Sequence, residues 1–301
     1  SLWQILPLGH TGYGDSPYQA FSAFAGQPLL ISPDELIKDG LLYGDDLRDY
    51  PHFNPDHIYY GDVIPAKLRI LHRSYEIFKE SADLCMLKEF DVFCEHEKDW
   101  LDDYALFMAG KDAHGGACWL EWEDDLRDPD EEIKAAWRER LADSIEYYKY
   151  IQFIFFRQWN ASRDYAHVNG IKIVGDIPIF VALDSADVWA NRELFQLEKD
   201  GYPTVVAGVP PDYFSATGQL WGNPLYDWDY HKKTHYDWWM HRIKGQLNMV
   251  DYIRVDHFRG FEQYYAIPYG EETAMHGKWK KGPNEDLFLR MQEVFGKDLP
   301  I

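Results

Sequence analysis

The chain lacks long apolar runs and is poor in positive charge. In its 301 residues no stretch approaches the roughly eighteen consecutive apolar side chains needed to cross a bilayer, so the sequence predicts no transmembrane helix. Lys and Arg number 30 against 51 Asp and Glu, which gives a net charge of −21. Such an excess repels nucleic-acid phosphates and anionic lipid headgroups, so neither nucleic acid nor a membrane surface is an expected partner.

Cysteine is also scarce. The three cysteines, Cys85, Cys94 and Cys118, form no CxxC pair and no metal-ligand spacing. An odd, sparse count fits a reducing compartment better than a disulfide-stapled secreted protein. We therefore expect a cytoplasmic protein, or a plastid protein if the source is a plant or an alga.

Motifs for cofactors are missing. Gly9 to Gly14 is glycine-rich but has neither the dinucleotide-binding spacing nor a following helix, and no phosphate-cradling GxxxxGK occurs. His231, His235 and His241 are expected on one helix, but the carboxylate of an HExxH motif is absent and their neighbours suit a surface face. The sequence predicts no metal and no organic cofactor.

Aromatic side chains, in contrast, are abundant. They make up 17% of the residues, with 12 Trp and 21 Tyr, in a chain that is 46% hydrophobic and long enough for a large core. Aromatic rings stack on the apolar faces of neutral ring-shaped ligands, so a sugar is the first ligand to consider. Both termini look cut, because Ser1 leads directly into an apolar run and Ile301 ends another.

The order of the expected elements indicates an α/β fold. A long amphipathic helix from Ile133 to Trp159, closed by Asn169-Gly170, precedes a β-branched strand, and a helix, a second strand and a third helix follow. This alternation is typical of a parallel sheet or barrel. The expected segments are a strand at 2–8, loops and short helices at 33–65, helices at 65–111, an acidic stretch at 121–132, a strand at 171–176, a helix at about 230–247, a strand at 251–256, a helix at about 285–295 and an apolar run from 299.

Two of these strands end in a carboxylate, Asp176 and Asp256. In barrels the carboxyl ends of strands face the active-site mouth, so charged residues there are often catalytic. Arg254 shares a face with Asp256, because side chains alternate along a strand, and its charge favours the ionised carboxylate that a nucleophile needs. A buried structural Asp–Arg pair or a strand-end cap explains the same pattern equally well. On the residues alone, both interpretations stay open.

The segment from Pro210 to Pro224 has the composition of a loop. Tyr213, Phe214 and Trp221 are costly to expose unless they pack or bind something. The loop either packs back onto the core or covers the site of the two carboxylate strands, which it separates in the sequence.

Together these segments resemble the amylomaltases, or 4-α-glucanotransferases, of glycoside hydrolase family 77. The resemblance rests on motifs that are long and chemically unusual: WQILPLG with GYGDSPYQ at 3–19, GDIPIFV at 175–181, PDYF through GNP at 211–224, and RVDHFRG at 254–260. It covers nearly the whole chain and is loose only in the helical middle. His10 is a small departure, since the family commonly has Pro there.

The resemblance implies a (β/α)8 barrel of the α-amylase clan, present here as a fragment of the catalytic barrel domain with a mainly helical insertion at about 34–130. It implies that Asp256 is the nucleophile and that Arg254 holds it ionised. The residues implied to bind the substrate are Tyr18, Asp176 and His257 at the donor sugar and Tyr213, Phe214, Gln219 and Trp221 at the acceptor side.

The implied activity is transfer of α-1,4-glucan segments, by a retaining double displacement, from a glucan or maltooligosaccharide donor to the 4-hydroxyl of an acceptor such as glucose or maltose. The family's general acid/base Glu would lie beyond Ile301, so residues 1–301 alone are expected to be an inactive internal fragment. An amylase-like retaining hydrolase and a non-catalytic glucan-binding fragment are the alternatives.

Overall fold

A computed structural model describes all residues, 1–301, and divides the chain into two compact units. The sheet unit comprises Ser1–Phe24, Ala117–Asp128 and Arg163–Ile301, and the helical unit comprises Ala25–Gly116 and Pro129–Ser162. The helical part therefore reaches further along the chain than the insertion expected at 34–130, and residues 117–128 belong to the sheet unit.

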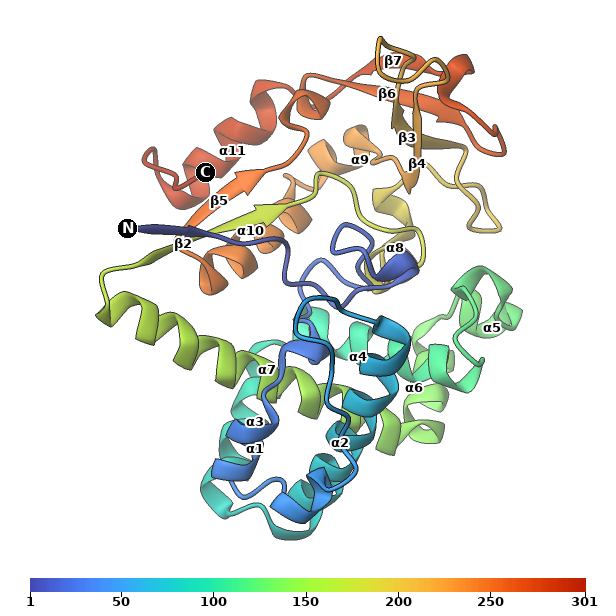
Figure 1. Ribbon diagram of the computed structural model, residues 1–301. Coiled ribbons are helices and arrows are strands. Elements are labelled where there is room, and N and C mark those ends of the chain that lie inside the picture. The colour runs from blue at the N-terminus through green and yellow to red at the C-terminus, as the bar shows by residue number, and fades with distance from the viewer. The chain divides into compact units, whose positions relative to one another are not determined.

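A three-stranded parallel sheet carries the expected strands of the sheet unit, although the strand expected at 2–8 ends at Gln4 (Figure 1). The strand order is β1-β2-β5, with β1 at Leu2–Gln4, β2 at Lys172–Ile177 and β5 at Tyr252–Val255. Asp176 pairs in register with Arg254, and the Asp256 N–H donates to the carbonyl of Ile177 at 2.9 Å. Ile253 N–H donates to the Pro300 carbonyl at 2.8 Å, so the expected apolar run after 299 adds to the open edge of β5.

The helices after β2 differ partly from expectation. The single helix expected at 230–247 is two helices, α9 at Trp228–Lys233 and α10 at Asp237–Met249. They separate because His235 and Tyr236 take positive φ angles of 54° and 58°, which no α-helix accommodates. Helix α11, at Glu285–Phe295, confirms the expected helix there. The unit also contains the short helices α5 at Asp124–Arg127 and α8 at Ala186–Ala190.

A four-stranded antiparallel sheet, which the sequence did not predict, lies in the same unit (Figure 1). Its order is β4-β3-β6-β7, with β3 at Val205–Val209, β4 at Gln219–Pro224, β6 at Gln263–Pro268 and β7 at Lys278–Lys281. The prediction of a loop throughout 210–224 is therefore wrong for its second half. Gly208 must be glycine, because a Cβ there would lie 2.2 Å from the Gln219 carbonyl oxygen across the ladder.

Six α-helices make up the helical unit, although α7 runs on into the sheet unit after Ser162. Helix α2 starts five residues before the expected helix, so Pro65 lies inside it. The helix expected from 133 to 159 is broken at Leu141 into α6 and α7, and Gly170, with φ of 70°, follows its end as predicted. The bounds are α1 Pro33–Lys38, α2 Tyr60–Ser81, α3 Leu84–His96, α4 Lys98–Ala113, α6 Glu131–Arg140 and α7 Ala142–Val168.

Side-chain caps explain where several of these helices begin. Asp83, Asp130 and Asp227 each accept a hydrogen bond from the backbone N–H three residues later, at 2.8, 2.8 and 3.0 Å, at the starts of α3, α6 and α9. Such a cap satisfies one of the free N–H groups of the first turn and stabilises the helix by about 1 kcal/mol.

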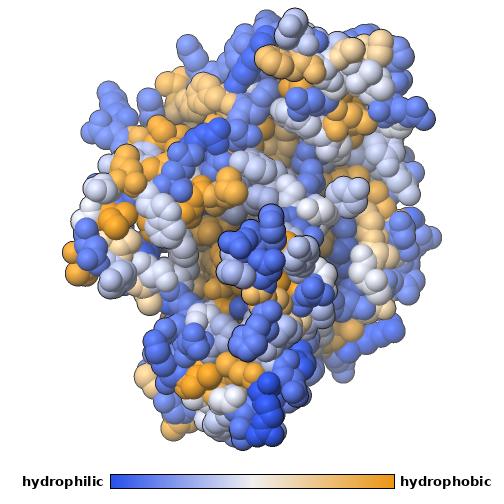
Figure 2. All heavy atoms as spheres, viewed as in Figure 1, coloured by the Kyte–Doolittle hydropathy of each residue, from blue (hydrophilic) through white to orange (hydrophobic).

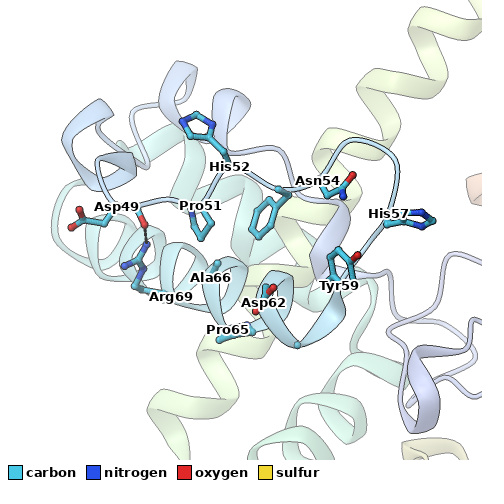
Figure 3. Close-up of a pocket in the computed structure, with 12 residues that line it drawn as sticks. Asp49, Pro51, His52, Asn54, His57, Tyr59, Asp62, Pro65, Ala66 and Arg69 are labelled. Atoms are coloured by element: carbon cyan, nitrogen blue, oxygen red, sulfur yellow. Dashed lines mark hydrogen bonds between the residues drawn. The ribbon is translucent and has the colours of Figure 1, made fainter.

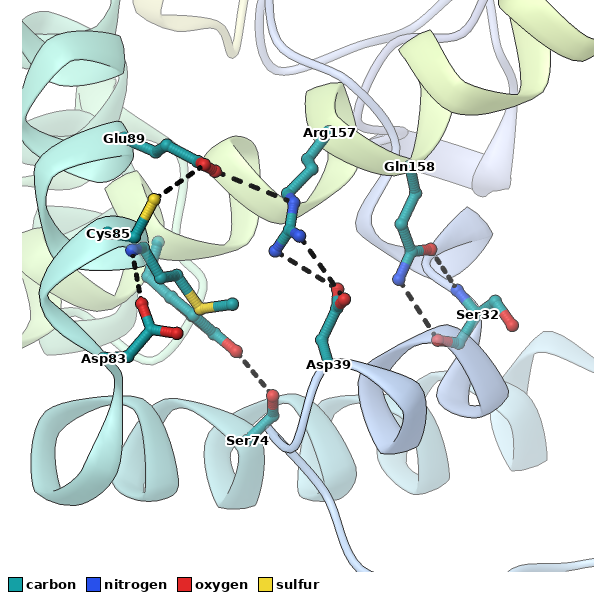
Figure 4. A network of polar contacts seen from close by, with 10 residues as sticks. Ser32, Asp39, Ser74, Asp83, Cys85, Glu89, Arg157 and Gln158 are labelled. Carbon is teal, nitrogen blue, oxygen red and sulfur yellow. Dashed lines mark hydrogen bonds and ion pairs between the residues drawn. The ribbon is translucent and has the colours of Figure 1, made fainter.

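Helix α7 organises the polar contacts of the helical unit (Figure 4). Arg157 forms ion pairs with Asp39, at 3.3 Å, and with Glu89, at 3.9 Å. The next residue, Gln158, accepts from the Ser32 N–H at 2.7 Å and donates to the Ser32 carbonyl at 3.3 Å. These contacts link α7 to α3 and to the residues at both ends of α1. The polar side chains of this region therefore hold helices together.

Apolar residues on the face shown in Figure 2 lie in separate patches among polar ones. None of the helices combines the length and the apolar character that a bilayer-crossing segment requires.

Candidate active site

Four of the predicted site residues meet at the carboxyl ends of β2 and β5. The Asp176 side chain is 1% exposed and accepts hydrogen bonds from Tyr18 Oη at 2.8 Å and from Arg254 Nη1 at 2.9 Å. Arg254 also donates from Nη2 to Asp256 Oδ1 at 3.1 Å. Tyr18, Asp176, Arg254 and Asp256 therefore form one cluster, although 80 positions separate the two carboxylates in the sequence.

A cavity of about 350 Å³ opens beside this cluster, and Asp256 lines it. The Asp256 side chain is 40% exposed, and its Oδ2 accepts no hydrogen bond from the protein. Tyr18 and His257 line the same cavity, whereas Asp176 and Arg254 lie outside its lining and contact it through Tyr18 and Asp256. The Asp256 carboxylate is thus oriented through one oxygen while the other stays available.

Charges and burial set the protonation of the neighbouring groups. Burial, with the hydrogen bond to Asp176 adding to it, raises the pKa of Tyr18 to about 12, so this hydroxyl remains a donor at neutral pH. The Asp176 carboxylate, followed by Asp256, raises the pKa of Arg254 above its ordinary value. Burial lowers the pKa of His257, which favours the neutral ring at pH 7.

Six further residues line the cavity that the sequence analysis did not select: Ser16, Gln19, Pro178, Ile179, Phe180 and Asn223. All of them lie within the motifs on which the resemblance rests. The motifs therefore marked the right segments, but they did not show which positions in each segment line the cavity. Gln19 donates to Asn223 Oδ1 at 3.4 Å, and Asn223 donates to the Val181 carbonyl at 2.9 Å. The amides therefore join three motif segments around one cavity.

The predicted loop residues divide into two groups. Trp221 lines the cavity, and its ring meets that of His257 edge-on at 4.9 Å. Gln219 accepts a hydrogen bond from Trp221 Nε1 at 3.0 Å but does not line the cavity. Tyr213 and Phe214 are 97% and 92% exposed and lie outside the lining. The structure brings Trp221 to the site and leaves Tyr213 and Phe214 in solvent.

The tip of this loop is held by its own hydrogen bonds. Asp212 Oδ1 accepts from the backbone N–H groups of Phe214 and Ser215 at 2.9 and 2.8 Å, and Gly218 turns with φ of 71°. An Asx turn of this kind orders the backbone while its apolar side chains project outward.

Another cavity, of about 560 Å³, lies in the helical unit between residues 49–59 and the start of α2 (Figure 3). It contains none of the predicted site residues. Arg69 donates to the Asp49 carbonyl across one end of it at 3.1 Å.

No cluster of three or more His, Cys, Asp or Glu side chains in the structure could hold a metal ion. The expectation of a surface face for the three histidines is wrong for His231, which is fully buried, and right for His235 and His241. His231 packs edge-on against Tyr226 at 5.2 Å, so it belongs to the core.

These features define an α/β protein whose candidate active site is a carboxylate–guanidinium cluster at the carboxyl ends of parallel strands. The chain belongs to the 4-alpha-glucanotransferase family, because the model of that family, glycoside hydrolase family 77, matches residues 1–301.

Individual relatives agree with this assignment. The 4-alpha-glucanotransferases of Thermus thermophilus and of a Synechocystis species are 48% and 46% identical over 299 and 302 residues, which are 99% and 100% of this chain. The amylomaltase of Streptococcus agalactiae, solved in complex with acarbose, is 40% identical and superposes with a TM-score of 0.95, covering 100% of this chain and 60% of its own. The chain spans about 60% of the length of the curated relatives it matches.

Proposed function

We propose that the full-length protein transfers α-1,4-glucan segments from a glucan or maltooligosaccharide to the 4-hydroxyl of an acceptor sugar such as glucose or maltose. The observation that carries the proposal is the Asp256 carboxylate, which lines the cavity with one oxygen paired to Arg254 and the other unengaged. Relatives named 4-alpha-glucanotransferase that are 46–48% identical support it.

In the proposed mechanism Asp256 attacks the anomeric carbon of the donor, and the glycosidic oxygen leaves with a proton from a general acid. The covalent glycosyl-enzyme is then attacked by the acceptor hydroxyl, whose proton returns to the same group. In this scheme Tyr18 and His257, which line the cavity, bind the donor sugar, and the buried Asp176 orients Tyr18 through their hydrogen bond. The segment from Tyr213 through Gln219 to Trp221 contacts the acceptor side.

No residue lining the cavity other than Asp256 is a carboxylic acid. We assign the acid/base role to the Glu that the resemblance places on the strand after Ile301, and we infer that the parallel strands belong to a (β/α)8 barrel that carries the helical insertion. A cytoplasmic or plastid location and the inactivity of residues 1–301 alone stay predictions.

Replacing Asp256 by Asn in the full-length protein tests the proposal. The variant keeps the shape and the contact with Arg254 but removes the nucleophile. We expect glucose and maltopentaose formation from maltotriose to fall by about 10⁴-fold or more, as when other catalytic groups that act as a unit are removed.

Asp251→Asn is the matched control. Asp251 lies just before β5, at its opposite end, and accepts from the Ile173 N–H at 2.8 Å and from His167 at 2.9 Å. Its substitution should lower stability but leave turnover within about threefold. Full transfer activity in Asp256→Asn would disprove the assignment. Glucose and maltose in equal amounts, with no longer product from the wild-type protein, would favour the hydrolase instead.

A further inference from the structure

A buried cation lies behind the wall of the site cavity. Arg242, on α10, is 3% exposed and forms no ion pair. Moving a charged group from water into a protein interior is costly unless polar partners replace its hydration. The arrangement around this guanidinium therefore needs an explanation.

Backbone carbonyls and aromatic rings surround the Arg242 guanidinium. Nη2 donates to the Pro178 carbonyl at 2.6 Å and Nη1 to the Ile179 carbonyl at 3.1 Å. The guanidinium carbon lies 5.4 and 5.0 Å from the ring centres of Trp238 and Trp239. Carbonyl dipoles and the negative faces of the rings stabilise the positive charge in place of a carboxylate.

The carbonyls that Arg242 binds belong to the segment that follows β2. Asp176 lies two residues before Pro178, and Pro178, Ile179 and Phe180 all line the cavity. At this point the chain has left the parallel ladder, so these carbonyls have lost their strand partners. Arg242 replaces the missing ladder and fixes the path of the cavity wall from outside.

Two neighbours show how closely this wall is held. Tyr226 Oη also donates to the Ile179 carbonyl, at 2.9 Å, and accepts from Arg242 Nη1 at 3.3 Å. On the opposite side, a Cβ at Gly260 would lie 2.7 Å from Ile179 Cδ1 and 3.0 Å from His257 Cδ2. A shift of Ile179 would therefore press on the turn that begins at His257, next to Asp256.

We propose that Arg242 is a positioning residue for the candidate active site, and this proposal rests on the proposed transfer activity. Arg242 does not line the cavity; it acts through the Pro178 and Ile179 carbonyls, which hold the wall between Asp176 and His257 in place. Misplacement of reacting groups by about 1 Å can lower turnover 10²-fold, so the expected effect is on kcat.

The test uses the full-length protein with maltotriose as substrate, well below the melting temperature of each variant. Arg242→Met removes every donor and keeps the apolar stem. We expect kcat to fall at least tenfold while KM stays within about threefold, because the substrate contacts remain but the wall is displaced. Arg242→Lys retains the charge and some donors, and should recover kcat to within about threefold of the wild type.

Lys67→Met is the control for the loss of a buried cation. Lys67, on α2 of the helical unit, is 8% exposed, forms no ion pair and donates to the Ile31 carbonyl at 2.7 Å. It shares the burial and the bonding of Arg242 but belongs to the other compact unit. The melting temperature of the Lys67→Met variant should fall as that of Arg242→Met does, while its kcat stays unchanged.

If Arg242→Met does not fold, Tyr226→Phe takes its place, because this change removes one donor to the Ile179 carbonyl and should lower kcat about threefold. A kcat within twofold of the wild type in Arg242→Met, or in Tyr226→Phe when Arg242→Met is unfolded, overturns the positioning role. A wild-type protein without transfer activity overturns the proposed function instead, which is a separate result.

Discussion

Gln152 in the helical unit and Asp256 in the sheet unit use their hydrogen-bonding capacity in opposite ways. Gln152 is fully buried on α7: Oε1 accepts from the Gly26 N–H at 2.7 Å, and Nε2 donates to the Gly26 carbonyl at 3.0 Å and to Tyr104 Oη at 3.2 Å. Asp256 is 40% exposed and has an oxygen without a protein donor. A saturated polar group fixes the fold, whereas an unsaturated one beside a cavity can react or bind.

The cations of the two units differ in the same sense. Arg157 of the helical unit forms ion pairs with Asp39 and Glu89, which link separate elements. Arg254 of the sheet unit lies between two carboxylates that belong to neighbouring strands, Asp176 and Asp256. Two like charges so close together would repel each other without it. Arg254 therefore allows the Asp176 and Asp256 carboxylates to lie close together, an arrangement that the stability of the fold does not require.

The largest expected effect on stability comes from Gln152→Leu. This change leaves the buried N–H and carbonyl of Gly26 without partners, and each unpaired group costs about 1–3 kcal/mol. The gap cannot close, because Gly26 already packs so tightly on Phe155 that a Cβ there would lie 1.9 Å from the ring. We expect the free energy of unfolding of the full-length protein to fall by about 4 kcal/mol in urea titrations, with kcat unchanged.

Gln158→Leu is the matched control for this prediction. Gln158 lies on the same helix and makes the same pair of bonds to the backbone of Ser32, but it is half-buried. Water can replace the lost amide there, so the cost should be about 1 kcal/mol. If Gln152→Leu and Gln158→Leu lost the same free energy of unfolding, burial would not be the cause of the large effect expected at Gln152.

A smaller effect is expected from His231, a buried titratable group without a role in the site. Burial lowers the pKa of His231 from 6.5 to about 4, so the folded protein holds the ring neutral. Between these two values the unfolded chain binds a proton that the folded chain does not, so stability is complete above pH 6.5 and falls as the pH drops toward 4. The loss should reach about 3 kcal/mol.

The measurement compares urea unfolding of the wild type and His231→Gln between pH 7.5 and pH 4. The wild type must be compared with the variant because burial also lowers the pKa of His10 to about 4. His10 therefore lowers the stability of both proteins at acidic pH, and only the difference between them reports on His231. A wild-type pH dependence that the substitution leaves unchanged would contradict the assignment to His231.

The local patterns predicted the parallel strands and α11 well, because β-branched runs and helical spacing are properties of a single segment. They failed where distant contacts decide. Gln219–Pro224 contains glycine and proline and becomes a strand only because β3 offers it a ladder. The helices expected at 133–159 and 230–247 broke at Leu141 and at His235–Tyr236, where the apolar spacing continued across the break.

The site shows the same limit. Asp176, Arg254 and Asp256 could be found because each follows or ends a recognisable strand, and the register of parallel strands brings such positions together. Arg242 could not be found, because its sequence neighbours on α10 give no sign that the side chain reaches the carbonyls of Pro178 and Ile179. Tyr213 and Phe214 were found from the composition of their loop, but both side chains lie in solvent outside the cavity lining.

Phe214→Ala carries the smallest expected effect on stability and sharpens the comparison most. An exposed ring contributes little to the fold, so the free energy of unfolding should change by about 0.5 kcal/mol or less. If the loop closes over the cavity when a glucan is bound, losing the ring admits water to the glycosyl-enzyme. The ratio of transfer to hydrolysis, followed as maltopentaose against reducing ends from maltotriose, should then fall about threefold.

Tyr165→Ala provides the control. Tyr165 is another aromatic residue that is 74% exposed, and its replacement should leave the ratio of transfer to hydrolysis unchanged. An unchanged ratio in Phe214→Ala would place this ring among the side chains that serve neither fold nor site.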